Sequence, residues 1–167
     1  MFKTEANLQA AFAGECQAYV RYTFFATKAA NEGFPEYATL FRAVAEAELI
    51  HARNHFQVMG GIGSTKDNLL AAATSEHYEI TRVYPGFVDQ AAVERNEKAK
   101  VSFDYADKAE KTHNDQFEKA MQALKAGTSA SRQTYFVCHT CGNLAVGEAP
   151  AKCPGCGSAP DSYKKVD

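Results

Sequence analysis

The sequence lacks several features that would place the protein in a specialised class. In its 167 residues no apolar run approaches the ~18 residues of a membrane-spanning helix, and no basic N-terminal stretch precedes an unbroken apolar one. The 18 Lys and Arg residues are scattered among 20 Asp and Glu residues, so the basic patch of a nucleic-acid-binding protein is missing. A Gly-x-Gly-x-x-Gly dinucleotide motif is also absent. We therefore expect a cytoplasmic protein that binds neither membranes nor nucleic acid.

Glycine and proline are also few, with 11 and 5 residues, while 46% of the residues are hydrophobic and 23% are charged. This composition is typical of a globular protein with a packed core. Residues that break helices become frequent from Gly127 onward, where the segment 127–131 has the character of a helix end followed by a linker. We predict one domain over residues 1–127, a linker over 128–132 and a small domain over 133–167.

Apolar residues recur with the 3.6-residue period of an amphipathic helix through most of the first domain, which predicts an all-α domain of four helices. The first helix ends near Asn31, and the second begins at Pro35, since proline suits the first turn of a helix. The glycine-rich segment 60–64 ends the second helix, and Thr65 or Asp67 is expected to cap the third.

Charged residues interrupt the apolar stripes in a repeating order. Glu15 is followed 33 residues later by Glu48 in a Glu-x-x-His motif, and Glu76 is followed 34 residues later by Glu110 in the same motif. Two hairpins with one pattern indicate an internally duplicated four-helix bundle. A Glu from each of two helices plus a Glu-x-x-His from each of the other two is the ligand set of a dinuclear carboxylate site. The candidate ligands are Glu15, Glu48, His51, Glu76, Glu79, Glu110 and His113.

The positions of the turns test whether these acids can meet. At a rise of ~1.5 Å per residue, Glu15 and Glu48 lie at nearly the same depth, because each is about sixteen residues from the first turn. In the second hairpin, the midpoint between the two acids falls slightly before the turn expected at residues 94–97. Pro85 lacks an amide hydrogen and should kink the third helix just before it. We expect this kink, or a bulge of one extra residue, to restore the register.

Carboxylates inside a bundle require positive charge nearby. A single Glu on a helix usually faces solvent or pairs with Lys or Arg, but these stripes contain no Lys or Arg. Each buried unpaired carboxylate costs several kcal/mol, and five of them would exceed the roughly 5–15 kcal/mol that stabilises a whole domain. Two divalent ions would compensate for the charge. Oxygen-rich ligation with one imidazole for each metal suits iron or manganese better than zinc, and we favour two non-haem iron ions.

Glu79 is a fifth carboxylate, beyond the four that balance two ferrous ions. Oxidation to the ferric pair adds two positive charges, so we expect Glu79 and His51 to exchange at one iron as the redox state changes. Tyr22 and Tyr84 carry hydroxyls near the predicted site and could donate to a ligating carboxylate. Three other residues have plainer interpretations: His55 as a helix-face residue, His77 as an exposed residue and Cys16 as a small apolar one.

Four of the five cysteines form two Cys-x-x-Cys pairs, Cys138 with Cys141 and Cys153 with Cys156. In a reducing compartment these pairs indicate metal ligation rather than disulfides. Residues 133–167 are too few for a self-sufficient apolar core, so a metal bound by four thiolates should hold the segment together. These ligands suit zinc as well as iron, and recombinant material could carry zinc. We favour one iron, because a one-electron centre could feed the dinuclear site.

Both parts of the sequence resemble the rubrerythrin family of ferritin-like di-iron proteins with a rubredoxin-like tail. The resemblance covers essentially the whole chain and implies an all-α ferritin-like four-helix bundle with a small C-terminal rubredoxin-like, cysteine-ligated metal-binding module. It implies seven di-iron ligands, alternation of His51 and Glu79 on one iron, hydrogen bonds from Tyr22 and Tyr84, and reduction of hydrogen peroxide to water. The motifs that carry it are Ala13-Gly14-Glu15, Glu48-Leu49-Ile50-His51, Glu76-His77-Tyr78-Glu79, Glu110-Lys111-Thr112-His113 and the two cysteine pairs.

The expected partners follow from the same resemblance. An external rubredoxin or an NAD(P)H-dependent reductase would supply electrons through the four-cysteine iron, and Glu79 would relay a proton to the leaving oxygen. The protein is expected to be a homodimer, with exchange of helices between subunits as one form of it. Two alternatives stay open: a ferroxidase or iron-storage protein, and a zinc-ribbon interaction protein. Substitution of Glu79 tests the first, and the colour and metal content of the purified protein test the second.

Overall fold

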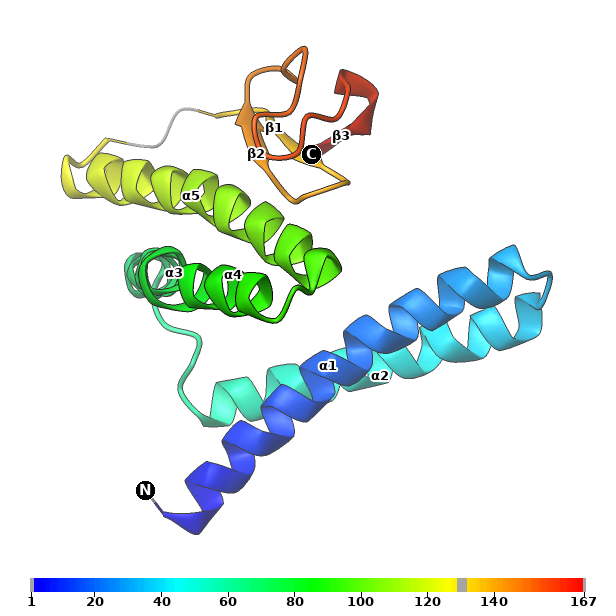
Figure 1. The fold of residues 1–167 in the computed structure, drawn as a ribbon. Coiled ribbons are helices and arrows are strands. Elements are labelled where there is room, and N and C mark those ends of the chain that lie inside the picture. Colours follow the sequence, from blue (N-terminus) through cyan, green and yellow to red (C-terminus); the bar gives the residue numbers. More distant parts are fainter. Residues whose placement is uncertain (1, 129–131, 167) are drawn as a thin grey trace. The chain divides into compact units, whose positions relative to one another are not determined.

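The computed structural model describes residues 2–128 and 132–166. The chain divides into two compact units, Met1–Gly63 and Ser64–Asp167. The first unit is a helical hairpin, and the second combines another hairpin with a small sheet (Figure 1). The predicted linker over 128–132 includes residues 129–131, which lie outside the described residues, so the domain boundary at this point stays a prediction.

The first unit consists of α1 (Lys3–Asn31) and α2 (Pro35–Val58), which run antiparallel side by side (Figure 1). Both helix bounds at the turn agree with the prediction, and Gly33 between them has a left-handed φ of 83°. Small side chains let the two helix backbones approach closely. The buried residues of the hairpin are Ala18, Ala26, Ala29, Ala38, Ala45 and Ala52.

The second unit begins with a helix that changes geometry along its length. The segments follow in the order α3 (Thr65–Tyr78), the π-helical η1 (Glu79–Val83) and α4 (Tyr84–Val93), and α5 (Glu97–Lys125) returns beside them (Figure 1). Pro85 lies in the first turn of α4, directly after the π segment. Because a π turn accommodates an extra residue, this geometry confirms the predicted bulge before Pro85. The turn into α5 also lies where the sequence predicts it.

The cap of α3 differs from the prediction. Ser64, rather than Thr65 or Asp67, precedes the first helical residue. The Ser64 hydroxyl accepts a hydrogen bond from the backbone N–H of Asp67 at 3.3 Å, and the Asp67 carboxylate accepts from the Ser64 N–H at 3.3 Å. Asp67 is therefore the third residue of the helix and closes a reciprocal capping box. The expectation of Thr65 or Asp67 as the cap was wrong because it placed the helix start too late.

The C-terminal part of the second unit is an antiparallel sheet of order β2-β1-β3. Its elements are β1 (Tyr135–Cys138), β2 (Leu144–Val146) and β3 (Tyr163–Val166), with a 3₁₀ turn, η2 (Pro160–Ser162), before β3. Cys138 closes β1 opposite Tyr163 of β3. Three such short strands provide little apolar core, as the sequence predicts for a module held together by a metal.

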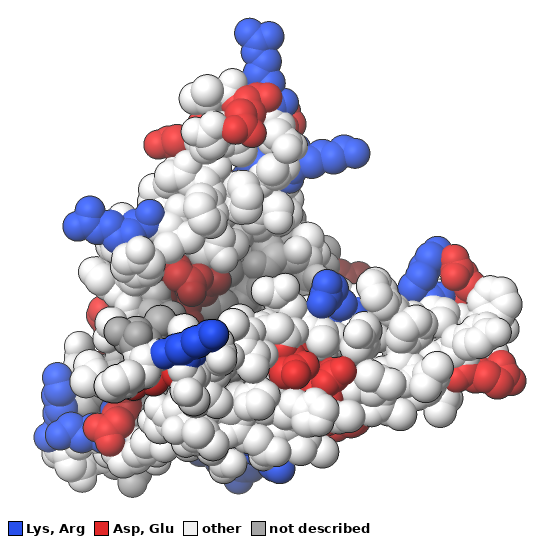
Figure 2. Space-filling view, turned by 90° about the horizontal axis from the view of Figure 1, so that it is seen from below, with Lys and Arg blue, Asp and Glu red and all other residues white. Residues whose placement is uncertain are grey.

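The surface carries charges of both signs. On the face drawn in Figure 2, Lys and Arg side chains alternate with Asp and Glu side chains among uncharged residues. On α5, ion pairs four residues apart join Asp104 to Lys108 and Asp115 to Lys119. Within residues 2–128 and 132–166, no helix is both long and apolar enough to cross a membrane.

Candidate metal centres

The first group of candidate ligands lies in the α1–α2 hairpin. One ligand atom from each of Glu15, Glu48 and His51 lies within 4.8 Å of the others. The two acids therefore meet at one depth, as their equal distances from the turn predict. His51 Nδ1 lies 2.9 Å from Glu48 Oε2, because the two residues are about one helical turn apart on α2. The Glu48 side chain is 18% exposed and that of His51 is 55% exposed, so only the carboxylate of this pair is largely buried.

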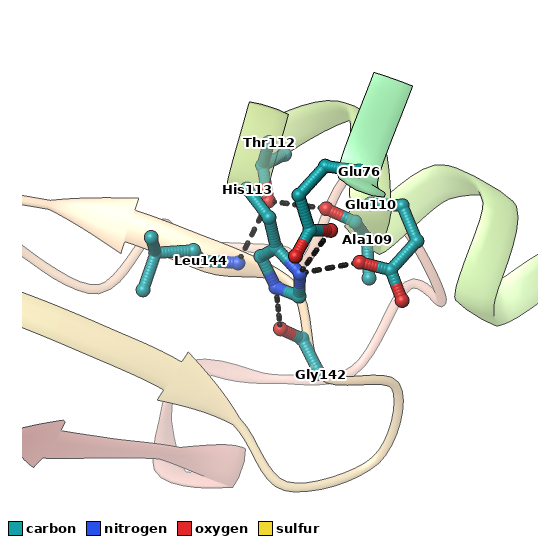
Figure 3. Close-up of polar contacts among 7 residues, drawn as sticks. All are labelled: Glu76, Ala109, Glu110, Thr112, His113, Gly142 and Leu144. Atoms are coloured by element: carbon teal, nitrogen blue, oxygen red, sulfur yellow. Dashed lines mark hydrogen bonds and ion pairs between the residues drawn. The ribbon is translucent and has the colours of Figure 1, made fainter. Parts of the chain in front are cut away.

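The second group lies between α3 and α5 (Figure 3). One ligand atom from each of Glu76, Glu110 and His113 lies within 4.8 Å of the others. His113 Nδ1 is 2.6 Å from Glu110 Oε2 and 3.6 Å from Glu76 Oε2. All three side chains are largely buried, with exposed fractions between 17% and 27%. The extra residue in η1 lies between Glu76 and the turn into α5. It compensates for the unequal numbers of residues that separate Glu76 and Glu110 from this turn.

The second group sets two carboxylates against one imidazole, so the protein does not fully compensate its negative charge. Glu76 Oε2 is buried, and among the described residues it has no hydrogen-bond partner. Burial, followed by the hydrogen bond and charge of Glu110, raises the pKa of Glu76 to about 7. Burial opposes protonation of His113, but hydrogen bonds with the Gly142 carbonyl and with Glu110 outweigh it and raise the His113 pKa. A divalent cation beside Glu76 would satisfy its orphaned oxygen, so these residues fit a metal.

Glu79 and Tyr84 lie at the two ends of the π segment. Glu79 is its first residue and is partly buried, but it does not belong to the close group of three. Burial raises the pKa of Tyr84, and the negative charges of Glu79, Glu110 and Glu76 raise it further. Hydrogen bonding with Glu79 acts in the same direction. The Tyr84 hydroxyl is therefore close to the carboxylates of the second group and is held in its protonated, donating form.

Tyr22 lies among aromatic residues of the first hairpin. Its ring centroid is 6.2 Å from that of Phe25 and 6.3 Å from that of Phe41. Within the described part of the chain, no hydrogen bond joins its hydroxyl to a candidate ligand, so the role expected for Tyr22 stays a prediction. His77 is exposed and Cys16 is partly buried with a free thiol.

The four predicted cysteine ligands form a third group. Sulfur atoms of Cys138, Cys141, Cys153 and Cys156 all lie within 4.8 Å of one another. The Sγ–Sγ distance is 3.7 Å between Cys138 and Cys156 and 3.6 Å between Cys141 and Cys153. Four sulfurs placed tetrahedrally at ~2.3 Å from a metal would be about 3.8 Å apart. The spacing therefore fits a tetrahedral four-thiolate ion, and it suits iron and zinc alike.

Hydrogen bonds favour the ionised form of two of these sulfurs, those of Cys153 and Cys156. Burial opposes ionisation of Cys153, but the Tyr163 hydroxyl and the backbone amides of Cys156 and Gly155 outweigh it and lower the Cys153 pKa to about 6. The Tyr163 hydroxyl also lies 2.9 Å from Oδ1 of the buried Asn143. Tyr163 and Asn143 were not predicted from the sequence. The position of Asn143, two residues after Cys141, is nevertheless a signal, because the backbone amide at this position faces the Cys141 sulfur.

Two hydrogen bonds connect α5 to the cysteine module (Figure 3). His113 Nε2 lies 3.0 Å from the Gly142 carbonyl oxygen. Nε2–H donates to this oxygen when the other ring nitrogen, Nδ1, faces the carboxylates of Glu76 and Glu110. Next to it, the Leu144 N–H donates to the Thr112 hydroxyl at 3.1 Å. A candidate di-iron ligand is thereby in direct contact with the residue that follows Cys141. This connection was not predicted from the sequence, because 29 residues separate the two partners.

Comparisons with known protein sequences agree with one another. A family model described as rubrerythrin matches residues 6–121, which is more than half of the chain. Rubrerythrin of Porphyromonas gingivalis is 35% identical over 177 residues, covering 96% of this chain and 88% of the relative. Rubrerythrin-2 of Clostridium acetobutylicum is 33% identical over 171 residues, covering 94% of this chain and 93% of the relative.

The structure agrees with these relatives. A solved structure described as fully reduced, all-ferrous nigerythrin matches with a TM-score of 0.58 at 32% identity, covering 99% of this chain and 88% of that one. The match spans the helical hairpins and the cysteine module. The predicted fold class, a ferritin-like helical domain followed by a rubredoxin-like module, is thereby confirmed.

Proposed function

The chain belongs to the rubrerythrin family, and from this premise we propose that it reduces hydrogen peroxide to water at a di-iron site, with electrons delivered through an iron in the rubredoxin-like module. The family consists of di-iron oxidoreductases linked to defence against peroxide. The observation that carries the proposal is the contact of His113 with Gly142. It joins a candidate di-iron ligand to a cysteine knuckle, the name we give to each Cys-x-x-Cys pair with the glycine that follows it, residues 138–142 and 153–157.

We assign the di-iron ligands to the residues predicted from the sequence. They are Glu15, Glu48, His51, Glu76, Glu79, Glu110 and His113. Four carboxylates balance two ferrous ions, and the orphaned oxygen of Glu76 supports a cation at this place. When bound, the two irons would supply the two electrons that cleave the oxygen–oxygen bond, so that one peroxide, two electrons and two protons give two waters.

We assign the handling of protons to Glu79 and Tyr84. Glu79 begins the π segment, where the backbone departs from regular helix geometry, and the Tyr84 hydroxyl lies at the segment's other end. In its donating form, Tyr84 orients the Glu79 carboxyl, which then passes a proton to the leaving oxygen. Alternation of His51 and Glu79 at one metal position is part of this assignment. The 55% exposure of His51 supports it, because tight packing does not hold the ring in one place.

We assign the electron route to the contact between α5 and the module. The Gly142 carbonyl accepts from His113 Nε2–H, and Gly142 follows Cys141, a ligand of the four-cysteine site. The route therefore crosses one hydrogen bond between the two groups of ligands. The adjacent bond of Leu144 to Thr112 holds the two elements at this distance.

We further propose an external electron donor and a homodimer. No dinucleotide motif is present in the sequence, so a separate rubredoxin or NAD(P)H-dependent reductase would reduce the module. Several large apolar side chains of the first unit are exposed, among them Phe24, Tyr37 and Leu40 at 67%, 61% and 59%. Association between copies, with or without exchange of helices, would cover such surfaces.

Rapid mixing tests the proposal. The fully reduced, iron-loaded protein is mixed with hydrogen peroxide without oxygen, and the absorption of both iron sites is followed. We expect both to be reoxidised, with one peroxide consumed for every two electrons. Glu79→Ala should slow the reaction about a hundredfold, since a positioned proton donor contributes about 10²–10⁴. Glu118→Ala, which removes an exposed acid of α5, serves as the matched control.

Each contrary outcome has a distinct meaning. Equal rates for wild type and Glu79→Ala would contradict the proton relay, and a module iron that stays reduced would contradict the electron route. Faster reaction with oxygen than with peroxide would favour a ferroxidase. A colourless protein with one zinc in the four-cysteine site would favour an interaction protein.

A further inference from the structure

Two hydroxyl groups connect the two cysteine knuckles at the edge of the four-sulfur group. Ser158 Oγ lies 3.1 Å from Cys156 Sγ, and Thr140 Oγ1 lies 3.0 Å from Ser158 Oγ. Thr140 belongs to the first knuckle, between Cys138 and Cys141, whereas Ser158 follows the second knuckle. The peroxidase proposal uses neither hydroxyl.

The direction of these hydrogen bonds follows from the chemistry of a metal-bound sulfur. A thiolate ligand has no proton and can only accept, so the Ser158 hydroxyl must donate to Cys156 Sγ. The Ser158 oxygen then accepts from the next hydroxyl, and Thr140 must donate to it. Both protons point toward the sulfur, and hydrogen bonds arranged in such a chain strengthen one another.

The Ser158 hydroxyl is the sequence-specific part of the sulfur environment. Backbone amides also face the sulfurs, including the amide of Ser158 itself, but almost any residue can supply an amide. The hydroxyl depends on this side chain. Cys156 is partly exposed, unlike the buried Cys138 and Cys153, and the hydroxyl chain lies on this exposed side. A fixed donor there replaces water that would otherwise reorient around the sulfur.

We propose that Ser158, oriented by Thr140, is a positioning residue that raises the reduction potential of the iron held by the four cysteines. Reduction adds one electron to the site, breaks no bond and moves no proton, and it increases the negative charge on the sulfurs. A hydroxyl that donates to Cys156 Sγ therefore stabilises the ferrous form more than the ferric form. The inference rests on the proposed function in one respect, namely that iron occupies this site.

A redox titration of the iron-loaded full chain against a dye of known potential tests the inference. We expect Ser158→Ala to shift the electron-transfer equilibrium with the dye about five- to tenfold toward oxidised protein. For a one-electron couple this corresponds to a reduction potential lower by about 40–60 mV. Ser158→Thr, which keeps a hydroxyl, should restore most of the potential. Thr140→Val should cause a smaller shift in the same direction. Ser162→Ala removes a hydroxyl from η2 and serves as the matched control.

A vibrational measurement separates hydrogen bonding from a general disturbance of the module. We expect exchange into D₂O to shift the iron–sulfur stretching bands of the wild type more than those of Ser158→Ala. An unchanged potential in iron-loaded Ser158→Ala, or equal shifts in D₂O, would overturn the inference. Should Ser158→Ala fail to retain iron, an unchanged potential in Thr140→Val would overturn it instead.

These measurements use no peroxide, so the two proposals can fail separately. A normal shift of potential together with absent peroxide turnover would contradict the proposed function alone. Normal turnover together with an unchanged potential would contradict the role of Ser158 alone.

Discussion

The pKa of Glu76 implies a specific pH dependence of the metal-free protein. The folded state raises this pKa from 4.5 to about 7, so between these values the folded protein holds a proton that the unfolded chain releases. The stabilisation is present in full below pH ~4.5 and is lost as the pH rises through about 7. Raising the pKa by this amount corresponds to about 3 kcal/mol of stability over the full pH range. The Glu76 side chain is only 20% exposed, so solvent weakens this contribution little. The raised pKa of His113 acts in the same direction.

Urea unfolding of the metal-free full chain at pH 5 and pH 8, followed by helical circular dichroism, measures this difference. Glu76→Gln is the matched control, because its amide keeps the shape of the side chain and does not titrate. The lowered pKa of Cys153 has the opposite effect, but it is present in both proteins and cancels in the comparison. We expect the wild type to lose about 2.5 kcal/mol more than Glu76→Gln between the two pH values, because a part of the full stabilisation is already lost at pH 5. Equal losses would refute the assignment of a proton to this carboxyl.

Two further substitutions separate the roles proposed for side chains near the sites. Thr112→Val leaves the Leu144 N–H without its acceptor and should slow peroxide-driven oxidation of the module iron several-fold, with little change at the di-iron site. The control Thr27→Val, which removes a hydroxyl bonded to the Thr23 carbonyl on α1, should not slow this oxidation. Rapid mixing at both absorption bands measures this effect. Tyr84→Phe removes the donor beside Glu79 and should lower peroxide turnover about tenfold while both irons remain bound; unchanged turnover would contradict the role of Tyr84.

The helical part of the fold could be predicted because its ends are marked by residues with strong local preferences. Pro35 can begin a helix but cannot continue one, and Gly33 takes the left-handed conformation that ends the preceding helix. The ligand groups follow from the same regularity, since a fixed rise and period convert sequence spacing into depth and face. Ser64 was misassigned because Ser64, Thr65 and Asp67 all have cap-forming side chains, and their positions alone do not show which one precedes the helix.

The connections of the cysteine module could not be predicted in this way. The contacts from Thr112 and His113 to the module join positions 29 to 32 residues apart, and no periodicity relates a helix to a loop that folds back on it. The hydroxyl pair of Thr140 and Ser158 is similar, because 18 residues separate its members. Such contacts depend on how the chain packs, whereas the cysteine pairs that they surround are visible in the sequence.

Gly142 illustrates why the metal module and its link to α5 are hard to separate by mutation. Its φ of 80° is in the left-handed region, so a residue with a side chain would strain the turn that follows Cys141. Space is not the constraint, since an added Cβ would lie 3.8 Å from the Ala109 Cβ, an ordinary contact. The same turn presents the Gly142 carbonyl to His113. A substitution at Gly142 would therefore disturb both the cysteine knuckle and the link. Thr112 takes part in the link but not in the knuckle, so it is the residue through which electron delivery can be tested with both ligand groups intact.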